Sequence, residues 1–503
     1  MRRVELVVPS LFARNARAVP RRPAASHGER VLSHAELDAA GDRIARALAT
    51  LGVERGDRVA TWCDTRLEVL ALFAGLAKRG AVFAPTNARL GAAEMAPVAA
   101  LARPRALVVD AERVDEAEPV ARELGVPLVA LGALGDAPAS GPRASLLARA
   151  AAERAGAFVE AQLCEADPHV VFFTSGSTGA PKGVVLSHRA SWLRSFQGVF
   201  VDAPETSVCM FPLFHMAAFT LALAAWQTGG EIALASPAPD DLLRAIEHRR
   251  ATRFYGLPAI WGRLLEHGLE RADVSSLRMA DTGTSAVPPE LVDALAERLP
   301  HATLRIYYGS TEAGAGTALA HADARRKPGR VGLPVPGVEL ALCDDGEIEL
   351  RSPFLMDGYF ENEAATRAAL VGGAYRTGDL GALDDEGYLS VVGRKRDVIR
   401  TGGETVAPPE VEAVLGAHPD VEEVAVVGIP DAAWGEIVCA VVVARAGRAP
   451  TLETLVAFAR DRLARFKLPR RLEIVDALPR TPATRQIQRP LVVERILACD
   501  AAR

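Results

Sequence analysis

The string FFTSGSTGAPKG, residues 172–183, holds the clearest candidate for chemistry in the chain. An apolar stretch runs directly into a loop of small and hydroxyl residues that ends at Lys182. Glycines let backbone N–H groups approach a polyphosphate closely, hydroxyls add donors, and the lysine adds a positive charge. The Walker pattern would need Ser or Thr after the lysine, but Gly183 follows Lys182. Taken alone, the string fits either a phosphate loop or an ordinary Ser/Gly linker.

Four further strings carry groups that suit nucleotide chemistry. YYGSTEAG (307–314) places an aromatic ring, a hydroxyl and a carboxylate within a few residues. YRTGDLG (375–381) offers Asp379 where a carboxylate can accept both hydroxyls of a ribose. GRKRDVIRTGGETVAPPEVE (393–412) joins a basic hinge to a double-glycine turn, and LPRTPATRQIQR (478–489) is a cation-bearing loop near the end of the chain. Together with the first string, they favour a nucleotide-binding enzyme over a linker.

The segments around these strings predict an α/β fold. Ser33 and Glu36 have the capping-box spacing and open an amphipathic helix. Residues 56–87 read as strand, helix and strand, and the alternation returns at 105–110 and 127–131. This pattern is typical of parallel sheets flanked by helices.

The pattern of predicted elements changes after Gly337. Short strands around acidic turns, VELALCDDGEIELRS and DDEGYLSVVGR, predict a small antiparallel or barrel-like unit. The charged run 393–397 then precedes a last segment with strand and helix patterns of its own, which is enough for an independent α+β lid. We therefore expect a domain boundary between residues 395 and 396.

Composition argues against several classes of protein. The 58 Lys+Arg and 63 Asp+Glu residues give a net charge of −5 without long blocks of like charge, so we expect no nucleic-acid partner and no anionic membrane partner. The six cysteines include no CxxC pair, which favours a reducing, cytoplasmic setting over a zinc knuckle or a disulfide framework. Residues 206–230 carry no charge, but Pro212 and Gln227 keep the apolar run below the ~20 residues of a membrane span. We expect a buried strand and helix there, and no stable membrane insertion.

With its motifs in this order, the sequence resembles the adenylate-forming superfamily of acyl-CoA synthetases, luciferases and peptide-synthetase adenylation domains. The resemblance runs from LSHAELD at Leu32 through the terminal loop. It implies an ATP- and acyl-binding domain over residues 1–395 and a mobile C-terminal lid over 396–503, with Arg396 as the hinge. The implied reaction activates a carboxylic acid as its acyl-adenylate and passes the acyl group to coenzyme A. ATP, Mg²⁺ and coenzyme A are the implied cofactors.

The resemblance also implies roles for single residues. Glu312 and Thr174 would hold Mg²⁺, Thr311 would contact the α-phosphate, and Lys182 would serve the other phosphates. His215 in FPLFHM would gate the acyl pocket near the path of the thiol. The phosphate-loop residues are Thr174, Ser175, Gly176, Ser177, Thr178 and Gly179. The residues implied at adenosine are Gly283, Thr284, Ser285, Tyr308 and Gly309, with Asp379 and Arg394 at the ribose, and those at the pantetheine arm are Gly402 and Gly403. The implied acyl pocket is formed by His215, Tyr255, Gly256, Pro258, Thr282 and Gly314.

One position departs from the family pattern. The last motif of the family reads like PRTPSGKI, and RTPATRQIQR places Arg485 where the family has its catalytic lysine. Arginine keeps the charge but is a planar fork rather than a compact ammonium, so we expect the geometry and rate of adenylation to differ.

Several alternatives stay open at this point. Arg485 is compatible with a nucleotide-binding pseudoenzyme, and the motifs also fit oxidative luciferase chemistry or adenylation for another acceptor. Amino-acid activation is disfavoured, because Phe214 and His215 stand where an aspartate usually meets the substrate ammonium. The mostly uncharged pocket favours an aliphatic or aromatic monocarboxylic acid, whereas a malonate-type diacid would want an arginine such as Arg253 or Arg263. A homodimer is also left open.

Overall fold

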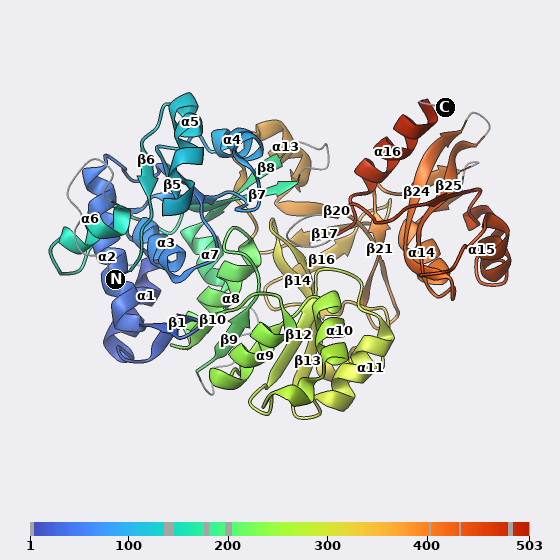
Figure 1. The fold of residues 1–503 in the computed structure, drawn as a ribbon, viewed down its shortest axis with the longest axis horizontal. Helices are drawn as coiled ribbons and strands as arrows, with labels where there is room; N and C mark the ends of the chain where they lie inside the picture. The colour runs from blue at the N-terminus through green and yellow to red at the C-terminus, as the bar shows by residue number, and fades with distance from the viewer. Residues whose placement is uncertain are drawn as a thin grey trace. The chain divides into compact units, whose positions relative to one another are not determined.

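The computed structural model describes residues 5–134, 145–175, 181–196, 204–401, 404–431, 434–480 and 486–501. The chain forms two compact units (Figure 1). Unit 1 contains residues 1–340 and 350–375, and unit 2 contains residues 341–349 and 376–503. Residues 376–395 thus belong to unit 2. The boundary between residues 395 and 396, expected from the charged run 393–397 and the implied hinge at Arg396, stays a prediction.

Unit 1 contains two sheets, which we call sheet A and sheet B. The described strands of sheet A lie in the order β15-β14-β13-β12-β11-β9-β10-β1-β2, and the neighbours from β13 through β1 pair in parallel. Their bounds are β1 Pro23–His27, β2 Arg30–Ser33, β9 Thr206–Cys209, β10 Glu231–Leu234, β11 Arg253–Tyr255, β12 Met279–Gly283, β13 Thr303–Ser310, β14 Gly314–Leu319 and β15 Leu333–Pro334. The predicted parallel α/β arrangement is therefore confirmed.

Sheet B has the order β18-β8-β7-β4-β3-β5-β6, with β3 to β7 parallel and β8 and β18 antiparallel. Its bounds are β3 Arg58–Trp62, β4 Val82–Pro85, β5 Ala106–Val109, β6 Leu128–Ala130, β7 Pro168–Ser175, β8 Pro181–Ser187 and β18 Gly358–Tyr359. The strand, helix and strand predicted over 56–87 are β3, α3 and β4. The antiparallel end of this sheet carries the predicted phosphate string.

The helices of unit 1 cover both sheets (Figure 1). Their bounds are α1 Pro9–Ala18, α2 His34–Thr50, α3 Leu67–Arg79, α4 Ala92–Leu101, α5 Val114–Leu124, α6 Leu146–Ala152, α7 His188–Arg194, α8 Met216–Gln227, α9 Pro239–His248, α10 Pro258–His267, α11 Pro289–Arg298, α12 His321–Ala324 and α13 Glu363–Ala369. Helix α3 is buried on nearly every side, and its Phe73 stacks on Phe219 of α8 with ring centroids 4.3 Å apart. This packing joins the two helices in one apolar core.

Two local predictions can be checked directly in unit 1. The capping box is present at the start of α2: the Ser33 hydroxyl accepts from the Glu36 backbone N–H at 3.2 Å, and the Glu36 carboxylate accepts from the Ser33 N–H at 2.8 Å. The uncharged stretch 206–230 forms the buried strand β9 and helix α8 as predicted. Within the described ranges, every helix is too short or too polar to cross a lipid bilayer.

Unit 2 includes most of an antiparallel sheet in the order β16-β17-β20-β19, with β21 on β20. The bounds are β16 Glu339–Leu342, β17 Glu347–Arg351, β19 Leu370–Val371, β20 Ala374–Leu383 and β21 Leu389–Arg394. This sheet is the small antiparallel unit predicted from the acidic turns.

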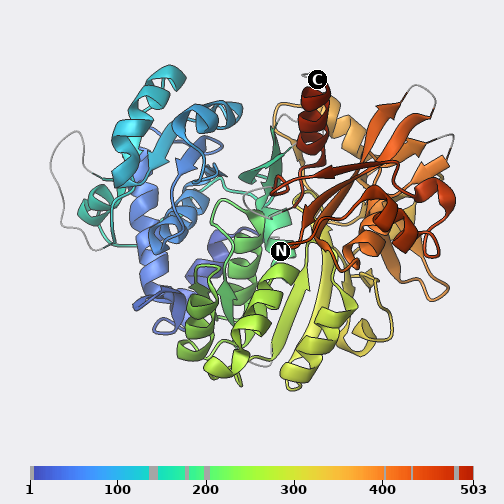
Figure 2. The ribbon, with the colours of Figure 1, turned by 45° about the vertical axis from the view of Figure 1, so that its right-hand side comes forward.

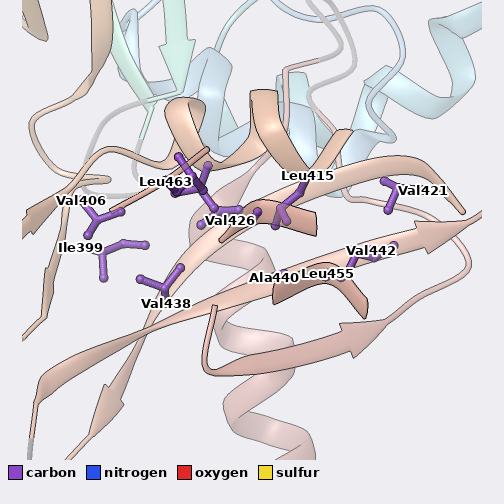
Figure 3. Close-up of a cluster of buried hydrophobic side chains, with 12 residues drawn as sticks. Ile399, Val406, Leu415, Val421, Val426, Val438, Ala440, Val442, Leu455 and Leu463 are labelled. Atoms are coloured by element: carbon purple, nitrogen blue, oxygen red, sulfur yellow. The ribbon is translucent and has the colours of Figure 1, made fainter. Parts of the chain in front are cut away.

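The last part of unit 2 is a sheet in the order β23-β22-β25-β24, with β26 on β25. The bounds are β22 Ile399–Thr401, β23 Glu404–Val406, β24 Val421–Asp431, β25 Gly435–Ala444, β26 Arg471–Ile474, and the helices are α14 Pro408–Gly416, α15 Leu452–Ala459 and α16 Arg489–Ala501. Val426 and Val438 face the side of α14 and α15, where Leu415 and Leu455 complete a buried cluster (Figure 3). The period of two along each strand exposes the alternate side chains to the opposite face.

Helix α16 lies against that opposite face (Figure 2). Its Val492 and Ile496 belong to one buried cluster with Val427 and Val441. The sequence predicts a cation-bearing loop over residues 478–489, and this helix is not predicted. Its start is marked by Pro490, which is favourable in a first helical turn.

Candidate active site

The predicted phosphate loop begins later than expected. Thr174 and Ser175 still belong to β7, and Thr174 pairs across the antiparallel hairpin with Lys182 of β8. The sequence reading placed both residues in the loop because their hydroxyls resemble loop composition. The strand continues because each residue has a backbone partner on β8. Gly176, Ser177, Thr178 and Gly179 lie outside the described residues, as does the side chain of Ser175.

Lys182 and Glu312 both contact Tyr359, a residue that the sequence reading missed. The Lys182 Nζ atom lies 4.8 Å from the centroid of the Tyr359 ring, within cation–π range. The Tyr359 hydroxyl donates to Oε1 of Glu312 at 3.1 Å. The structure therefore places the predicted phosphate lysine and the predicted metal carboxylate against one side chain.

Thr311 and Glu312 occupy the turn of the β13–β14 hairpin. Buried Arg194 of α7 donates to the backbone carbonyls of Thr311 and Glu312, both at 2.7 Å. The N–H of Met356 also donates to the Glu312 carbonyl at 2.7 Å. Burial lowers the pKa of Arg194 to about 10, so the guanidinium remains charged at neutral pH. The turn that presents both predicted catalytic groups is thus fixed from behind.

The predicted adenosine residues lie at the ends of neighbouring strands in sheet A. Tyr308 is half-buried on β13, opposite Thr317. A Cβ atom on Gly283 would lie 2.1 Å from the Tyr307 carbonyl oxygen, and one on Gly309 would lie 2.1 Å from the Gly314 carbonyl oxygen. The chain can approach itself this closely only at glycine.

Thr284 follows directly after β12 with a φ of +71°, an uncommon backbone conformation for a β-branched residue. Its hydroxyl lies 3.2 Å from the hydroxyl of Tyr255, and its side chain is exposed together with that of Ser285. Such strained positions cluster at ligand sites, where surrounding structure stabilises them. The observation supports the predicted role of residues 283–285 at a ligand.

Aromatic rings form the wall on which the predicted acyl residues lie. Phe211 stands 6.0 Å from His215 and 5.7 Å from Tyr255, and Tyr255 stands 6.2 Å from Tyr307, measured between ring centroids. His215 is the N-cap of α8, and its Nδ1 atom accepts from the Ala217 N–H at 3.3 Å. Burial lowers the pKa of His215 to about 4, so the ring is neutral at pH 7. The candidate gate therefore also has a structural role.

The remaining acyl-pocket residues are less accessible. Thr282 is fully buried, and its hydroxyl has no hydrogen-bond partner in the structure. Gly256 is closely packed, since a Cβ atom there would lie 2.8 Å from Nε1 of Trp261. Pro258 begins α10 and is buried, and Gly314 begins β14 beside Gly309.

A buried charge network lies within sheet A beside this wall. Asp281 on β12 has no exposed surface and pairs with Nε of Arg253 and Nε of Arg305, each at 2.7 Å. Arg253 also pairs with Glu205 at 3.3 Å. Burial would raise the pKa of Asp281, but the two arginines outweigh it and hold the pKa below its ordinary value. The suggestion that Arg253 could receive a second substrate carboxylate is corrected, because its guanidinium is already buried against two carboxylates. Arg263 is exposed on α10 and donates to the Pro237 carbonyl at 3.4 Å.

Unit 2 brings together the two residues predicted at the ribose. Asp379 on β20 is buried opposite Arg394 on β21, and Nε of Arg394 lies 2.6 Å from the Asp379 carboxylate. Arg396 is exposed in the turn that follows β21, with its Nε 3.4 Å from Asp397. Gly402, Gly403 and Arg485 lie outside the described residues.

A second exposed feature of unit 2 was also missed. Trp434 is 42% exposed directly before β25, and the guanidinium of Arg470 lies 3.5 Å from its ring centroid. The neighbouring Gly435 pairs with Thr401, directly before the predicted pantetheine glycines. The residue type of Trp434 is a sequence signal that could have pointed to this surface, because tryptophan is rarely fully buried and is enriched at interfaces.

Comparison with known proteins decides the family. A model of the AMP-binding enzymes matches residues 12–360, and a model of the AMP-binding enzyme C-terminal domain matches residues 410–485. The chain belongs to the AMP-binding enzyme family. The resemblance found in the motifs is thereby confirmed.

Relatives in this family align along nearly the whole chain. An indoleacetate–CoA ligase of Aromatoleum aromaticum is 36% identical over 93% of this chain and 94% of its own. ATP-bound MatB from Rhodopseudomonas palustris is 29% identical, with a TM-score of 0.87 over 97% of this chain and 98% of that one. The amide bond synthetase McbA from Marinactinospora thermotolerans is 31% identical, with a TM-score of 0.84 over 97% of this chain and 99% of that one.

Proposed function

We propose that the chain is an ATP-dependent acid–CoA ligase. In the first step, an oxygen of the substrate carboxylate attacks the α-phosphorus of ATP, and pyrophosphate leaves to give the acyl-adenylate. In the second step, the thiol of coenzyme A attacks the acyl carbon, the thiol proton is lost, and AMP leaves. The observation behind this proposal is that Lys182 and Glu312 both contact Tyr359. These contacts place a cation for phosphates and a carboxylate for a metal close together.

The donor set fits Mg²⁺ bound together with a nucleotide. Mg²⁺ is usually held by one or two carboxylates plus substrate phosphates, rather than by a cage of protein ligands. Glu312, with the hydroxyl of Thr174, would hold the ion, which supplies charge to offset that on the phosphates. Lys182 would bind phosphate oxygens as a point charge, and Thr311 would donate to the α-phosphate.

The nucleoside would be held by the residues that the family resemblance implies. Tyr308 would stack on adenine with Gly283, Thr284, Ser285 and Gly309 around it, and Asp379 and Arg394 would hold the ribose. Asp379 is suited to this task because a carboxylate accepts hydrogen bonds from hydroxyls, and Arg394 holds this carboxylate at 2.6 Å.

The thiol step would use the C-terminal part of the chain. Gly402 and Gly403 would lie along the pantetheine arm, and the Trp434–Arg470 surface offers a stacking face and a positive charge for the nucleotide end of coenzyme A. Arg485 would act only in the first step, and rotation about Arg396 would separate the two steps.

The acid is proposed to be an aromatic or aliphatic monocarboxylic acid. Phe211, His215 and Tyr255 present neutral rings, and Arg253 is already paired. Asp281 is likewise paired, so it is not offered to a substrate ammonium. The likeness to an indoleacetate–CoA ligase supports an aryl-acetic acid as the first acid to test.

The likeness to an amide bond synthetase supports a second candidate acceptor, an amine that would replace coenzyme A in the second step. The first step would be the same for both acceptors, so adenylation alone does not distinguish them. Coenzyme A and a panel of simple amines, each added to preformed acyl-adenylate, would separate the two functions.

The proposal is tested with a panel of aryl-acetic, cinnamic and straight-chain acids. Pyrophosphate release is measured without coenzyme A, and thioester formation is then measured with it. We expect acid-dependent release for at least one class and thioester formation with that acid. A folded enzyme that binds ATP but releases no pyrophosphate with any acid would contradict the ligase and favour the pseudoenzyme.

Two further properties are proposed. All six cysteines are free thiols, which supports a reducing, cytoplasmic location. A homodimer stays a prediction, and light scattering on the same preparation measures it.

A further inference from the structure

The segment Phe354–Phe360 contacts both halves of the phosphate site within unit 1. On one side it follows β8: the Phe360 N–H donates to the Gly183 carbonyl at 2.8 Å, and the Asp357 carboxylate accepts from the Ser187 N–H at 2.5 Å. Residues Gly358 and Tyr359 form β18, which pairs antiparallel with β8. The segment is therefore attached to the strand that carries Lys182.

On its other side, the same segment holds the Glu312 turn. The Met356 N–H donates to the Glu312 carbonyl at 2.7 Å, and the Phe354 carbonyl accepts from Nε of Arg194 at 2.9 Å. The other nitrogens of Arg194 donate to the Thr311 and Glu312 carbonyls. The backbone of Glu312 is thus fixed by hydrogen bonds that leave its side chain to be positioned separately.

Tyr359 supplies that separate contact. It is 9% exposed, and its hydroxyl donates to Oε1 of Glu312 at 3.1 Å. A tyrosine hydroxyl carries its proton at neutral pH, so it can act as the donor to this carboxylate. One carboxylate oxygen is occupied in this way, and a carboxylate has a second oxygen with which to meet a cation.

The ring of Tyr359 lies under Lys182, whose ammonium is 4.8 Å from the ring centroid. An ammonium over an aromatic face is attracted by the ring quadrupole without losing its donors to a neutralising carboxylate. The lysine is therefore held in place while its three N–H groups remain suited to phosphate oxygens.

We propose that Tyr359 is a positioning residue for adenylation, whose hydroxyl orients the Glu312 carboxylate and whose ring orients Lys182. The inference rests on the proposed function, in which Glu312 serves Mg²⁺ and Lys182 serves the phosphates. The two charges are thereby set at a fixed spacing by one rigid side chain. Preorganised charges of this kind need no rearrangement when the nucleotide reacts.

The test uses Tyr359→Phe, which keeps the ring under Lys182 and removes only the hydroxyl. We expect the kcat of acid-dependent pyrophosphate release to fall about tenfold, since a hydrogen bond to a charged group is lost. The KM for the acid should stay within about twofold, and the Mg²⁺ concentration for half-maximal rate should rise several-fold. Tyr388→Phe is the matched control, because Tyr388 is a mostly buried tyrosine of unit 2 that has no assigned role in the site. It should leave all three quantities unchanged.

A double-mutant cycle separates positioning from a general structural effect. In the Glu312→Gln background, Tyr359→Phe should reduce the residual rate by less than about twofold, because the carboxylate through which the hydroxyl acts is absent. A further tenfold loss in that background, or a Tyr359→Phe enzyme with wild-type rate and Mg²⁺ dependence, would overturn the proposal.

A binding experiment does not depend on finding the acid. The affinity of the full-length protein for α,β-methylene-ATP is measured by calorimetry across a Mg²⁺ series. Tyr359→Phe should weaken Mg²⁺-dependent binding several-fold, while binding without Mg²⁺ should be unchanged. Equal Mg²⁺ dependence in variant and wild type rejects the positioning role. A weaker Mg²⁺ dependence in the variant, together with no pyrophosphate release by the wild type from any acid, rejects the ligase function alone.

Discussion

The stacked histidines His169 and His188 make unit 1 sensitive to acid. Their ring centroids are 4.5 Å apart and both rings are buried. Nδ1 of His188 accepts from the Val8 N–H at 3.3 Å, and the Nε2 atom is buried with no hydrogen-bond partner in the structure. Burial lowers the pKa of His188 from 6.5 to about 4. A proton on this ring therefore destabilises the folded protein.

The sign and size of the effect follow from linkage. The unfolded chain binds a proton at this histidine below pH 6.5, whereas the folded chain does so only near pH 4, so stability is lost as the pH falls through this window. At 1.36 kcal/mol for each tenfold change in proton affinity, the loss is about 2 kcal/mol at pH 5 and about 3.4 kcal/mol well below pH 4. His169, whose pKa burial also lowers, adds a loss of the same sign.

The measurement compares the wild type with His188→Gln, which keeps a hydrogen-bond acceptor but does not titrate. Melting temperatures are recorded at pH 7, 6 and 5 at one scan rate. For a unit of about 370 residues, 2 kcal/mol corresponds to roughly 2–3 °C. The wild type should therefore lose that much more than the variant between pH 7 and pH 5. His248→Gln, at an exposed histidine at the end of α9, should follow the wild type. Parallel curves for His188→Gln and the wild type would refute the reasoning.

Three further predictions concern the site. Glu312→Gln should reduce acid-dependent pyrophosphate release by about 10²–10³ at unchanged melting temperature, as expected for one preorganised charge, and near-normal turnover in saturating Mg²⁺ would contradict its role. Asp281→Asn should lower the unfolding free energy by about 3–5 kcal/mol in urea titrations, because it leaves the buried Arg253 and Arg305 undercompensated, and a change below 1 kcal/mol would show that the network is not coupled. His215→Asn keeps an N-cap for α8 and should change the preference among acids without moving the pH–rate profile between pH 6 and 8, since the ring is already neutral there. An acid limb that disappears in this variant would show that His215 titrates near neutrality.

Periodicity and motif order predicted much of this molecule. The capping box at Ser33, the strand–helix–strand of residues 56–87 and the buried segment 206–230 are local patterns, and each is present. Helix α16 was not predicted because its local sequence signal is weak. Its apolar residues Val492 and Ile496 are buried only through contact with β24 and β25. A helix whose partner is distant in the sequence leaves a weak local signal.

Some site residues could be predicted from local motifs, and others could be found only from contacts in the fold. Lys182, Glu312 and Tyr308 lie in recognisable strings, so their types and spacing were enough to single them out. Tyr359 and Arg194 belong to no such string, and their roles depend on contacts across 47 and 117–118 residues of sequence. Residue type alone could not find them, because a buried tyrosine or arginine is compatible with many purely structural roles.

The sequence shows which residues are charged, but it does not show which of these charges are already paired in the fold. Arg253 lies two residues before Tyr255 of the acyl wall, so its position along the chain suited a receptor for a second carboxylate. In the fold it is buried between Asp281 and Glu205, and Arg305 completes a network of two cations and two carboxylates. Removing one member would leave a buried charge uncompensated. Arg253 therefore cannot leave its carboxylate partners to bind a substrate without a large loss of stability. The acyl wall is thus neutral because its nearest charges are already engaged with one another.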